Sequence, residues 1–576
     1  MTSPLSASGY RLTASGYRLT ASGYRPTAIG YRLSALTALA IFLASCAPPD
    51  ARQASVSPTG GTLVILTAGD ADVLFPPAGS VTTSADVAGL IFSRLAELTN
   101  DLNTVDDAGF RPSLARSWEH ADSTTLVFHL DPRARWHDGV SVHAADVAFS
   151  FGVYRDTLVA SRFGPNLAAI DSVTVRDSLT VVYHFARWYP EQLYDATYHT
   201  KVLPKHLLDT IPPARLANAA FGRAPVGSGP FRFVRWDAGT GIEVAADTSY
   251  FLGRPKLDRV VWRVVPDFGA AVSALLAGEG DALAVIPQAE LRDRVRAAPD
   301  LRLVPYASNG VAYVAFNLKG RGGRGVHPIF GDRDVRRAIA MGVNRTAIVR
   351  SLFGAEGEVP VGPTARAQWI WSDSIRQLRY DPAEARRLLD ARGWLTRSSD
   401  GLREKRGVPL RFTLLLPTTS RARQDAAVLV QAQLRAIGVD ARLEPLEFAL
   451  FEQRSAQKAF DAVFQSRTFD ASPVGILQLF GSAGVRQSNY GSYESPIFDS
   501  LAARAIAAPT RAAARPLWRD ALGTLNDDAA AVFLFSPPFS AAFQRRFAGV
   551  SIRPDEWLAT VAEWSVPAQA RLPRDR

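Results

Sequence analysis

The chemistry-bearing side chains of this chain are not spaced like those of an enzyme. No HExxH, GxSxG or GxxxxGK stretch occurs in the sequence, so the common metal, nucleophile and phosphate-binding motifs are absent. The eight histidines are scattered, and only His137 and His143 lie within six positions of each other. We interpret this pair as surface or packing residues. The sequence therefore predicts a protein that is not an enzyme, with no metal site and no cofactor.

Two glycine-rich segments could suggest nucleic-acid or phosphate binding. The first, GRGGRG at 320–325, is a single copy between an expected strand and an expected helix, and we interpret it as a loop. The second, PVGSGPFRF at 225–233, lacks the lysine and the helix start that a phosphate-binding loop requires. We expect its glycines to allow a turn with positive φ beside a strand over 231–236.

The only cysteine, Cys46, ends the stretch SALTALAIFLASC at 34–46. Arginines, a short apolar run and small residues precede it, which is the layout of a secretory signal and too short for a comfortable membrane span. The last four residues resemble a bacterial lipobox, where cleavage precedes the cysteine and a lipid joins its side chain. We therefore predict a signal peptide over 1–45, lipidation at Cys46, and a lipidated Pro- and Ser-rich tether over 46–60.

A seven-residue unit, ASGYRLT, is repeated almost perfectly over 7–34, and each copy carries one Tyr-Arg pair. Such an array could contact nucleic acid. Because the repeats precede the predicted cleavage point, we expect them to be absent from the working protein and to supply at most the basic start of the signal.

The composition favours a folded protein. The chain has 576 residues, of which 47% are hydrophobic and 21% charged, and its formal net charge is +10. Four of the positive charges fall in the repeats, at Arg11, Arg18, Arg25 and Arg32. Basic and acidic residues alternate through the remainder, whereas nucleic-acid binders concentrate basic residues in one stripe. We expect no nucleic-acid partner.

Helical and strand patterns alternate along the chain. The run TTLVFHL at 124–130 has the strand period, and 171–185 reads as a hairpin with its turn at 176–178. Ser84 is expected to cap a helix, and Asp381, followed by Pro382, another. A further helix is expected to stop at Gly438 before a strand. The alternation predicts an α/β protein.

Six segments, in order, resemble those of one family of proteins. They are PSLARSWEHADSTTLVFHL at 112–130, RWHDGVSVHAADVAFSF at 135–151, PVGSGPFRFVRW at 225–236, LAGEGDAL at 276–283, YVAFNL with the following FGDRDVRRAIAMGVNRTAIV at 313–349, and NYGSYESPIFDSLAARA at 489–505. They are similar to stretches of the extracytoplasmic solute-binding proteins of family 5, the oligopeptide- and dipeptide-binding components of ABC importers. The resemblance covers nearly all of residues 60–550.

This resemblance implies an α/β, two-lobed periplasmic-binding-protein clamshell (type II, cluster C) with an extra third domain. Lobe I would comprise 58–97, 204–306 and 536–576, the extra domain 98–203, and lobe II 307–535. The chain would be a lipid-anchored monomer outside the cell membrane. It would bind short peptides between the lobes and deliver them to an ABC permease and ATPase complex.

The resemblance also implies ligand-binding residues. Oligopeptide binders of the family pair the peptide ammonium with an Asp ten positions after the Phe of an FD pair, and that spacing from Phe460 leads to Asp470. A loop Trp of the family is replaced by Arg467, which could meet an anionic group instead. A loop over Val81–Ser84, with Thr82, Thr83 and Ser84, would pair with the peptide backbone.

Alternatives stay open at this point. Asp470 and Ser84 could each be a helix cap without a role in binding. Relatives of the family also handle oligosaccharides, nickel chelates and other small solutes. A sensory lipoprotein that binds without transport would need the same fold.

Overall fold

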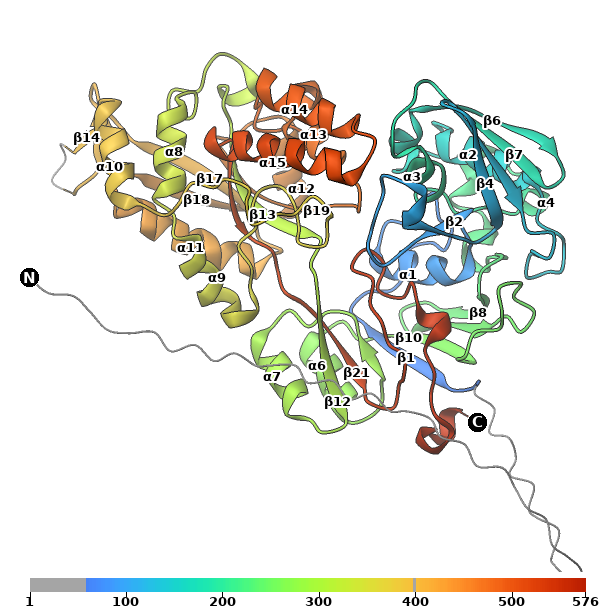
Figure 1. Ribbon diagram of the computed structural model, residues 1–576. Helices are drawn as coiled ribbons and strands as arrows, with labels where there is room; N and C mark the ends of the chain where they lie inside the picture. Colours follow the sequence, from blue (N-terminus) through green and yellow to red (C-terminus); the bar gives the residue numbers. More distant parts are fainter. Residues whose placement is uncertain (1–58, 397–399, 576) are drawn as a thin grey trace, which may run out of the picture. The chain divides into compact units, whose positions relative to one another are not determined.

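The computed structural model describes residues 59–396 and 400–575 (Figure 1). The heptad repeats, the predicted signal peptide and Cys46 lie outside these residues. All described residues belong to one compact unit, which spans 57–576. Within the described ranges, no helix combines the length and apolar character needed to cross a membrane.

Three sheets of four or more strands organise this unit. The largest has seven strands, in the order β12-β21-β11-β1-β10-β9-β8. Its strands are β12 (Leu301–Tyr306), β21 (Phe539–Gln544), β11 (Ala282–Leu283), β1 (Thr62–Thr67), β10 (Arg259–Val264), β9 (Gly241–Ala246) and β8 (Phe231–Asp237). β1 pairs in parallel with β10 and β11, and the other pairs are antiparallel. Helices α1 (Thr82–Ile91), α6 (Phe268–Leu276) and α7 (Ala289–Ala297) accompany this sheet.

The second sheet has five strands, in the order β18-β17-β19-β13-β20. They are β18 (Asp440–Leu446), β17 (Arg411–Pro417), β19 (Ala462–Thr468), β13 (Gly310–Phe316) and β20 (Ala531–Phe535). Every residue of β13 is buried. Val311, Tyr313 and Ala315 join one apolar cluster, while Ala312, Val314 and Phe316 join another. A strand covered on both faces needs such a continuous apolar run.

Helices cover both faces of the five-stranded sheet, as Figure 1 shows. One apolar cluster takes its side chains from α8 (Arg333–Met341), α9 (Arg345–Phe353), α10 (Pro382–Ala391) and α11 (Arg421–Arg435). The other takes them from α12 (Phe448–Ala456), α13 (Gly475–Phe480), α14 (Pro496–Ile506) and α15 (Arg511–Asp527). The small strands β14 (Leu395–Thr396), β15 (Arg403–Lys405) and β16 (Val408–Pro409) form a separate sheet.

The third sheet is antiparallel, in the order β4-β5-β7-β6. Its strands are β4 (Ala115–Asp122), β5 (Thr125–Leu130), β7 (Thr180–Phe185) and β6 (Ile170–Asp177). Short helices stand beside it, together with a two-stranded sheet: α2 (Ala144–Arg155), α3 (Gln192–Thr197), α4 (Lys205–Leu208), α5 (Pro213–Leu216), β2 (Ala96–Leu98) and β3 (Phe110–Pro112). Its core is continuous with that of the seven-stranded sheet, because Leu63 and Phe128 belong to one apolar cluster.

The chain passes between the seven-stranded and five-stranded sheets twice. β12 ends at Tyr306 and β13 begins at Gly310, and β20 ends at Phe535 and β21 begins at Phe539. β12 pairs with β21 and β13 pairs with β20, so the two crossings run side by side (Figure 1). Each crossing is three residues long, which leaves few backbone bonds to carry any relative motion of the two sheets.

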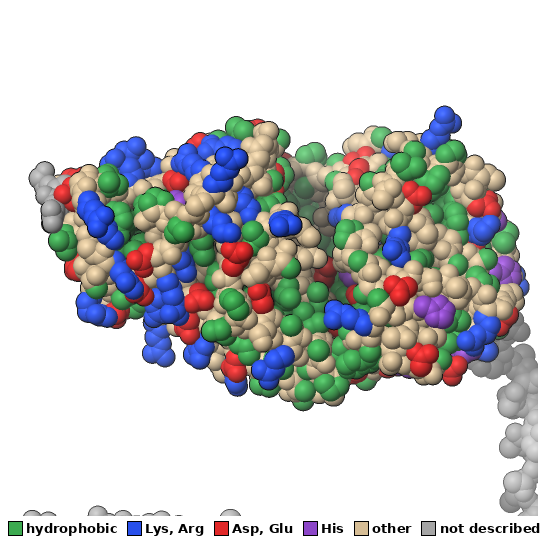
Figure 2. All heavy atoms as spheres, turned by 90° about the horizontal axis from the view of Figure 1, so that it is seen from above, with side chains coloured by type: hydrophobic (Ala, Val, Ile, Leu, Met, Phe, Trp, Pro, Cys, Tyr) green, Lys and Arg blue, Asp and Glu red, His purple; other side chains and the backbone are tan. Residues whose placement is uncertain are grey.

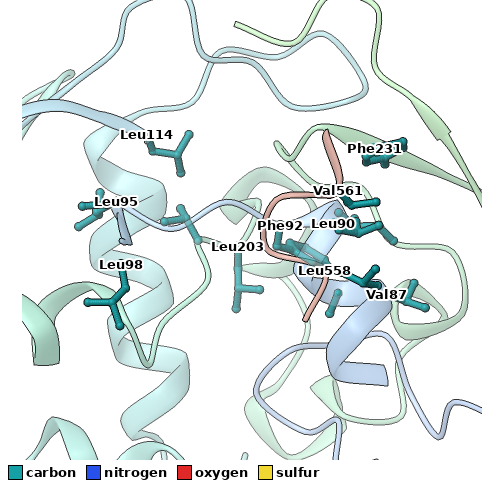
Figure 3. Packing of buried hydrophobic residues seen from close by; sticks show 14 of the residues in the cluster. Val87, Leu90, Phe92, Leu95, Leu98, Leu114, Leu203, Phe231, Leu558 and Val561 are labelled. Atoms are coloured by element: carbon teal, nitrogen blue, oxygen red, sulfur yellow. The ribbon is translucent and has the colours of Figure 1, made fainter. Parts of the chain in front are cut away.

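The C-terminal segment packs against α1. Leu558 and Val561 lie beside Val87 and Leu90 of the helix, and Phe231 lies nearby (Figure 3). All five side chains are buried. The last part of the sequence therefore completes the core around a helix near the beginning of the described chain.

Several local expectations are confirmed. β6 and β7 form the expected hairpin, although its turn lies at 178–179, because Arg176 and Asp177 still belong to β6. Asp381 caps α10 by accepting a hydrogen bond from the Glu384 backbone N–H at 2.9 Å. Helix α11 ends just before Gly438, and strand β18 follows. The φ of Gly438 is 84°, a conformation that favours a residue without a β-carbon.

Three expectations are wrong. α1 begins at Thr82, so 81–84 is not a loop, and Val81 rather than Ser84 occupies the cap position. Ser84 Oγ instead donates a hydrogen bond to Asp72 at 2.5 Å. The glycines of 225–233 do not have positive φ. They are needed for close approach, because a β-carbon on Gly227 would lie 1.9 Å from the Ile91 carbonyl oxygen.

Candidate functional site

A cavity of about 670 Å³ is lined by residues from all three large parts of the fold. Figure 2 shows the surface hollowed there, with hydrophobic side chains along the hollow. The size falls within the usual range of ligand pockets. The charged, polar and aromatic residues that line the cavity include Asp86, Arg94, Arg162, Asn166, Tyr198, His199, Lys201, Tyr306, Asn309, Asp470, Phe539, Asp555, Glu556 and Trp557.

The N-terminal end of α1 faces this cavity. Val81, Thr82 and Ser84 line it, and no side chain caps the helix. Thr82 is exposed, whereas Ser84 is buried. The first N–H groups of a helix have no partners inside the helix. They are therefore donors available to carbonyl or carboxylate oxygens of a ligand.

Asp470 reaches the cavity from the loop after β19. Its side chain is exposed to the cavity, and no residue in the described ranges forms an ion pair or side-chain hydrogen bond with it. Burial within the walls, followed by the negative charge of Asp555, raises the pKa of the Asp470 carboxyl. Gln368 holds the loop by donating a hydrogen bond to the Asp470 carbonyl oxygen at 3.0 Å.

Glu556 anchors a network of charges in the cavity wall. Arg94 donates two hydrogen bonds to its carboxylate, at 2.9 and 3.2 Å, and Arg553 donates another at 2.7 Å. Lys201 lies 3.6 Å away. Burial alone would raise the pKa of Glu556, but these three cations hold it well below its usual range. Burial lowers the pKa of Lys201 to about 8.

Asp555 is also paired. Arg553 Nε donates a hydrogen bond to it at 2.7 Å, and the Tyr198 hydroxyl donates another at 3.0 Å. With Asp555 and Glu556 both neutralised by cations, the wall can stay ionised without a ligand. Asp470 differs from them because, among the described residues, no cation forms an ion pair with it and Arg162 exerts only a minor electrostatic influence.

Arg162 brings a positive charge to the rim from the part of the chain that follows α2. Its guanidinium stacks over the Phe163 ring, 4.7 Å from the centroid. The positive charge of Arg162 lowers the pKa of Asp470, but this effect is smaller than the opposing effects of burial and Asp555. The neighbouring His199 is neutral at ordinary pH, since burial lowers its pKa to about 3.

The structure does not place every predicted binding residue on the cavity. Thr82, Ser84 and Asp470 line it, whereas Thr83 and Arg467 do not. Thr83 is buried and donates a hydrogen bond to the Gly69 carbonyl oxygen at 2.7 Å. Arg467 lies in β19, with its guanidinium 5.8 Å from the Tyr490 ring and 4.0 Å from Glu452.

Sequence reasoning missed most of the charged lining residues. The stretch RPDEWL at 553–558 carries two of them, Asp555 and Glu556, and the lining aromatic residue Trp557, and this density of charge was a usable signal. Lys201 was another, because the chain contains only six lysines. Arg94 and Arg162 gave no signal, since each is one arginine among many.

No group of three or more His, Cys, Asp or Glu residues within 59–396 and 400–575 is arranged to hold a metal ion. Within the described residues, the arrangement offers a cavity between packed sheets, the Asp470 carboxylate without an ion pair, and helix N–H groups that no side chain caps. Together with the three sheets and the two crossings, these features indicate a solute-binding protein with an α/β, two-lobed clamshell fold and an extra domain.

Comparison with known proteins specifies the family. Residues 109–487, well over half of the chain, match the model of the bacterial extracellular solute-binding proteins, family 5. The chain belongs to this family. The family is one of solute-binding proteins and not of enzymes.

Similar proteins cover almost the whole chain. The oligopeptide-binding protein AppA of Bacillus subtilis is 27% identical over 545 residues, which are 92% of this chain and 97% of that protein. The peptide transport periplasmic protein SapA of Salmonella typhimurium is 26% identical, over 91% and 96% of the two chains. The solved structure of Bacillus subtilis AppA with a nonapeptide superposes with a TM-score of 0.73, covering 88% of this chain and 99% of that one.

Proposed function

We propose that this protein binds short peptides in the cavity and delivers them to a membrane ABC permease and ATPase complex. The observation that carries the proposal is the Asp470 carboxylate, which faces the cavity and forms no ion pair with any residue in the described ranges. A peptide brings an ammonium group that supplies a partner for this charge, and a ligand that covers the exposed carboxylate would make an unpaired charge there costly. Similarity to the oligopeptide-binding AppA and to SapA supports a peptide as the ligand.

The first turn of α1 would bind the peptide backbone. Thr82 and Ser84 line the cavity beside helix N–H groups that no side chain caps. Because main-chain N–H groups hydrogen-bond to the peptide backbone, they can bind a peptide irrespective of its side chains. Arg467 and Thr83 lie outside the lining, and we assign them no direct contact with the ligand.

The lobes would close over the ligand by bending at the two crossings, 307–309 and 536–538. In this proposal lobe I comprises 58–97, 204–306 and 536–576, the extra domain 98–203, and lobe II 307–535. The seven-stranded sheet lies in the proposed lobe I, the five-stranded sheet in lobe II, and the four-stranded sheet in the extra domain.

The protein would act as an exported monomer, anchored by a lipid on Cys46 to the membrane that faces its permease. Intact mass of the membrane fraction tests this part. A mass that starts at Cys46 and includes the lipid supports it, and a mass that retains residues 1–45 contradicts it.

Calorimetry with defined peptides tests the binding function. We expect Kd values near micromolar, equivalent to about 8 kcal/mol. Mass spectrometry of ligand released from the purified protein gives an independent result. A protein that ignores peptides but binds an oligosaccharide or a nickel chelate would contradict the proposal. Uptake of labelled peptide, lost when the gene is deleted, separates transport from a sensory role.

A further inference from the structure

A second carboxylate in the cavity, that of Asp86, also has no protein cation. Asp86 lies in the second turn of α1, four residues after Thr82. Among the described residues, none forms an ion pair with it, and the charged group that influences it is another carboxylate, Glu556. Burial, and to a smaller extent Glu556, raises the pKa of Asp86 to about 7.

One of its oxygens is free. The Trp557 indole N–H donates a hydrogen bond to Asp86 Oδ2 at 2.9 Å. In the part of the chain that the structure describes, no group donates to Oδ1. This carboxylate is therefore held in position by one neutral donor and keeps one oxygen for something else.

Aromatic side chains border the same region of the cavity. Trp557, Tyr306 and Phe539 all line it, and the rings of Tyr306 and Phe539 are 5.5 Å apart. The Tyr306 hydroxyl is already used, since it donates to the Ala284 carbonyl oxygen at 3.0 Å. A carboxylate among aromatic rings suits an ammonium or guanidinium group at the end of an aliphatic stem, because rings cover the stem and also attract the charge.

We propose that Asp86, with Trp557 and Tyr306, forms a subsite for a basic side chain of the ligand. The inference rests on the proposed function, because the basic side chain would belong to a bound peptide. It is distinct from Asp470, which we assign to the peptide ammonium and which enters from the other lobe. A peptide carrying Lys or Arg at the residue beside the α1 turn would then bind more tightly than a neutral one.

Neighbouring charges are arranged consistently with this role. Glu556 forms ion pairs with Arg94, Lys201 and Arg553, and Arg553 also forms one with Asp555. These three cations are thus paired with other carboxylates, and the remaining lining cation among the described residues, Arg162, stacks on Phe163 and forms no ion pair with Asp86. A ligand cation is the partner left for Asp86.

Calorimetry at about pH 8, where Asp86 is mostly ionised, tests the subsite. The probes are tetra-alanine, its four single-Lys variants, and the four matching norleucine variants, which keep the stem without the charge. An N-acetylated form of each Lys peptide separates a side-chain cation from the terminal ammonium. We expect one Lys position to bind about tenfold more tightly than its norleucine counterpart, with or without acetylation.

Substitutions then assign the gain to Asp86. Asp86→Asn should abolish the Lys advantage and leave the norleucine peptides within about twofold, which also shows that the variant is folded. Asp86→Glu should retain the advantage, and Asp171→Asn, an exposed carboxylate outside the cavity, should change nothing. A Lys advantage that persists in Asp86→Asn, disappears on acetylation, or is absent at every position overturns the inference while neutral peptides still bind. If no peptide binds at all, the proposed function fails with it.

Discussion

Ser472 donates a hydrogen bond from its Oγ to Glu191 Oε2 at 2.6 Å, although the two residues are 281 positions apart. Glu191 precedes α3, beside the four-stranded sheet, and Ser472 follows β19 of the five-stranded sheet. Thr104 donates to the other oxygen of Glu191, and the Trp369 indole N–H donates to Thr104 at 3.2 Å. This contact joins the proposed extra domain to the proposed lobe II directly, across the cavity rather than through the crossings.

Apolar side chains reinforce the contact. Val105, beside Thr104, belongs to the apolar cluster of the five-stranded sheet, and Ala471, beside Ser472, belongs to the cluster of the other two sheets. Each side therefore contributes one buried residue to the core of the other. Opening of the cavity has to separate these residues and expose Glu191.

The first prediction concerns pH. Burial raises the pKa of Glu191 to about 7 in the joined form, and we expect about 4.3 once it is exposed. Below about pH 4, Glu191 is protonated in both the joined and the open form, so pH does not change the balance between the two forms. As pH rises between the two values, only the open form loses its proton, so the joined form becomes steadily less favourable. Above about pH 7 the effect is complete. Between about pH 5 and pH 8 we expect ligand-free protein to shift toward the open form by at least about tenfold.

Small-angle scattering across this pH range measures the shift as an increase in the radius of gyration. Glu191→Gln cannot ionise and should give a flat profile. Glu119→Gln, at an exposed position in β4, is the matched control and should keep the wild-type profile. The charge of Glu191 acts on one other carboxyl among the described residues, that of Asp195, and on the hydroxyls of Tyr189 and Tyr194. A pH response that survives in Glu191→Gln would therefore assign it to Asp195 and contradict this prediction.

A second prediction concerns Gly227. Its Cα faces the Ile91 carbonyl at the end of α1, where a β-carbon would lie 1.9 Å from oxygen. Backbone cannot yield as a flexible side chain does, so Gly227→Ala should destabilise the protein by about 2–3 kcal/mol. Gly152→Ala is the control, because nothing lies within 4 Å of its added carbon and the site is helical. It should stabilise by about 0.5–1 kcal/mol. Urea unfolding measures both, and equal effects would contradict the packing argument.

Local structure was largely readable from the sequence, because each signal lies within a few residues. The hairpin of β6 and β7 and the Asp381 cap depend on neighbours along the chain. The start of α1 was misplaced for the opposite reason. Ser84 has the right type for a cap, but its hydroxyl is bound by Asp72, twelve positions away. The start of helix α1 therefore depends on a contact with a residue distant in sequence, and not only on the residue types near the helix end.

The binding site was readable only where the family resemblance supplied a position. That resemblance led to Asp470 and to the α1 turn, both of which line the cavity. Asp86 could not be found this way, because its partner Trp557 lies 471 positions later. That Asp86 forms no ion pair also depends on how the chain folds, and no short stretch of sequence reveals it. Arg467 shows the converse, since it lies near Asp470 in sequence and outside the lining in space.

A third prediction concerns Asp470. If it binds the peptide ammonium, Asp470→Asn should weaken binding of a free tetrapeptide by about tenfold to a hundredfold. The N-acetylated tetrapeptide lacks that charge, so its weaker binding should hardly change. Asp373→Asn, whose side chain is 83% exposed, serves as control and should leave both affinities unchanged. Equal losses for the free and acetylated peptides would indicate a structural role for Asp470 and not recognition of the ammonium.

The last prediction concerns the end of the chain. Asp281 is fully buried, accepts the Val64 backbone N–H at 2.9 Å, and pairs with Arg546 at 2.9 Å and Arg574 at 2.7 Å. Asp281→Ala removes the shared anion, leaving Arg574 without this carboxylate and the buried Val64 N–H without its acceptor, while Arg546 keeps its pair with Asp575 at 2.6 Å. Since a buried polar group that loses its partner is costly and a partly exposed cation less so, we expect a loss of about 2–3 kcal/mol in the free energy of unfolding. Asp425→Ala breaks the exposed pair with Arg421 and should cost less than about 1 kcal/mol. Urea unfolding compares the two, and a loss at Asp281 no larger than that at Asp425 would show that the C-terminal segment is held by apolar packing alone.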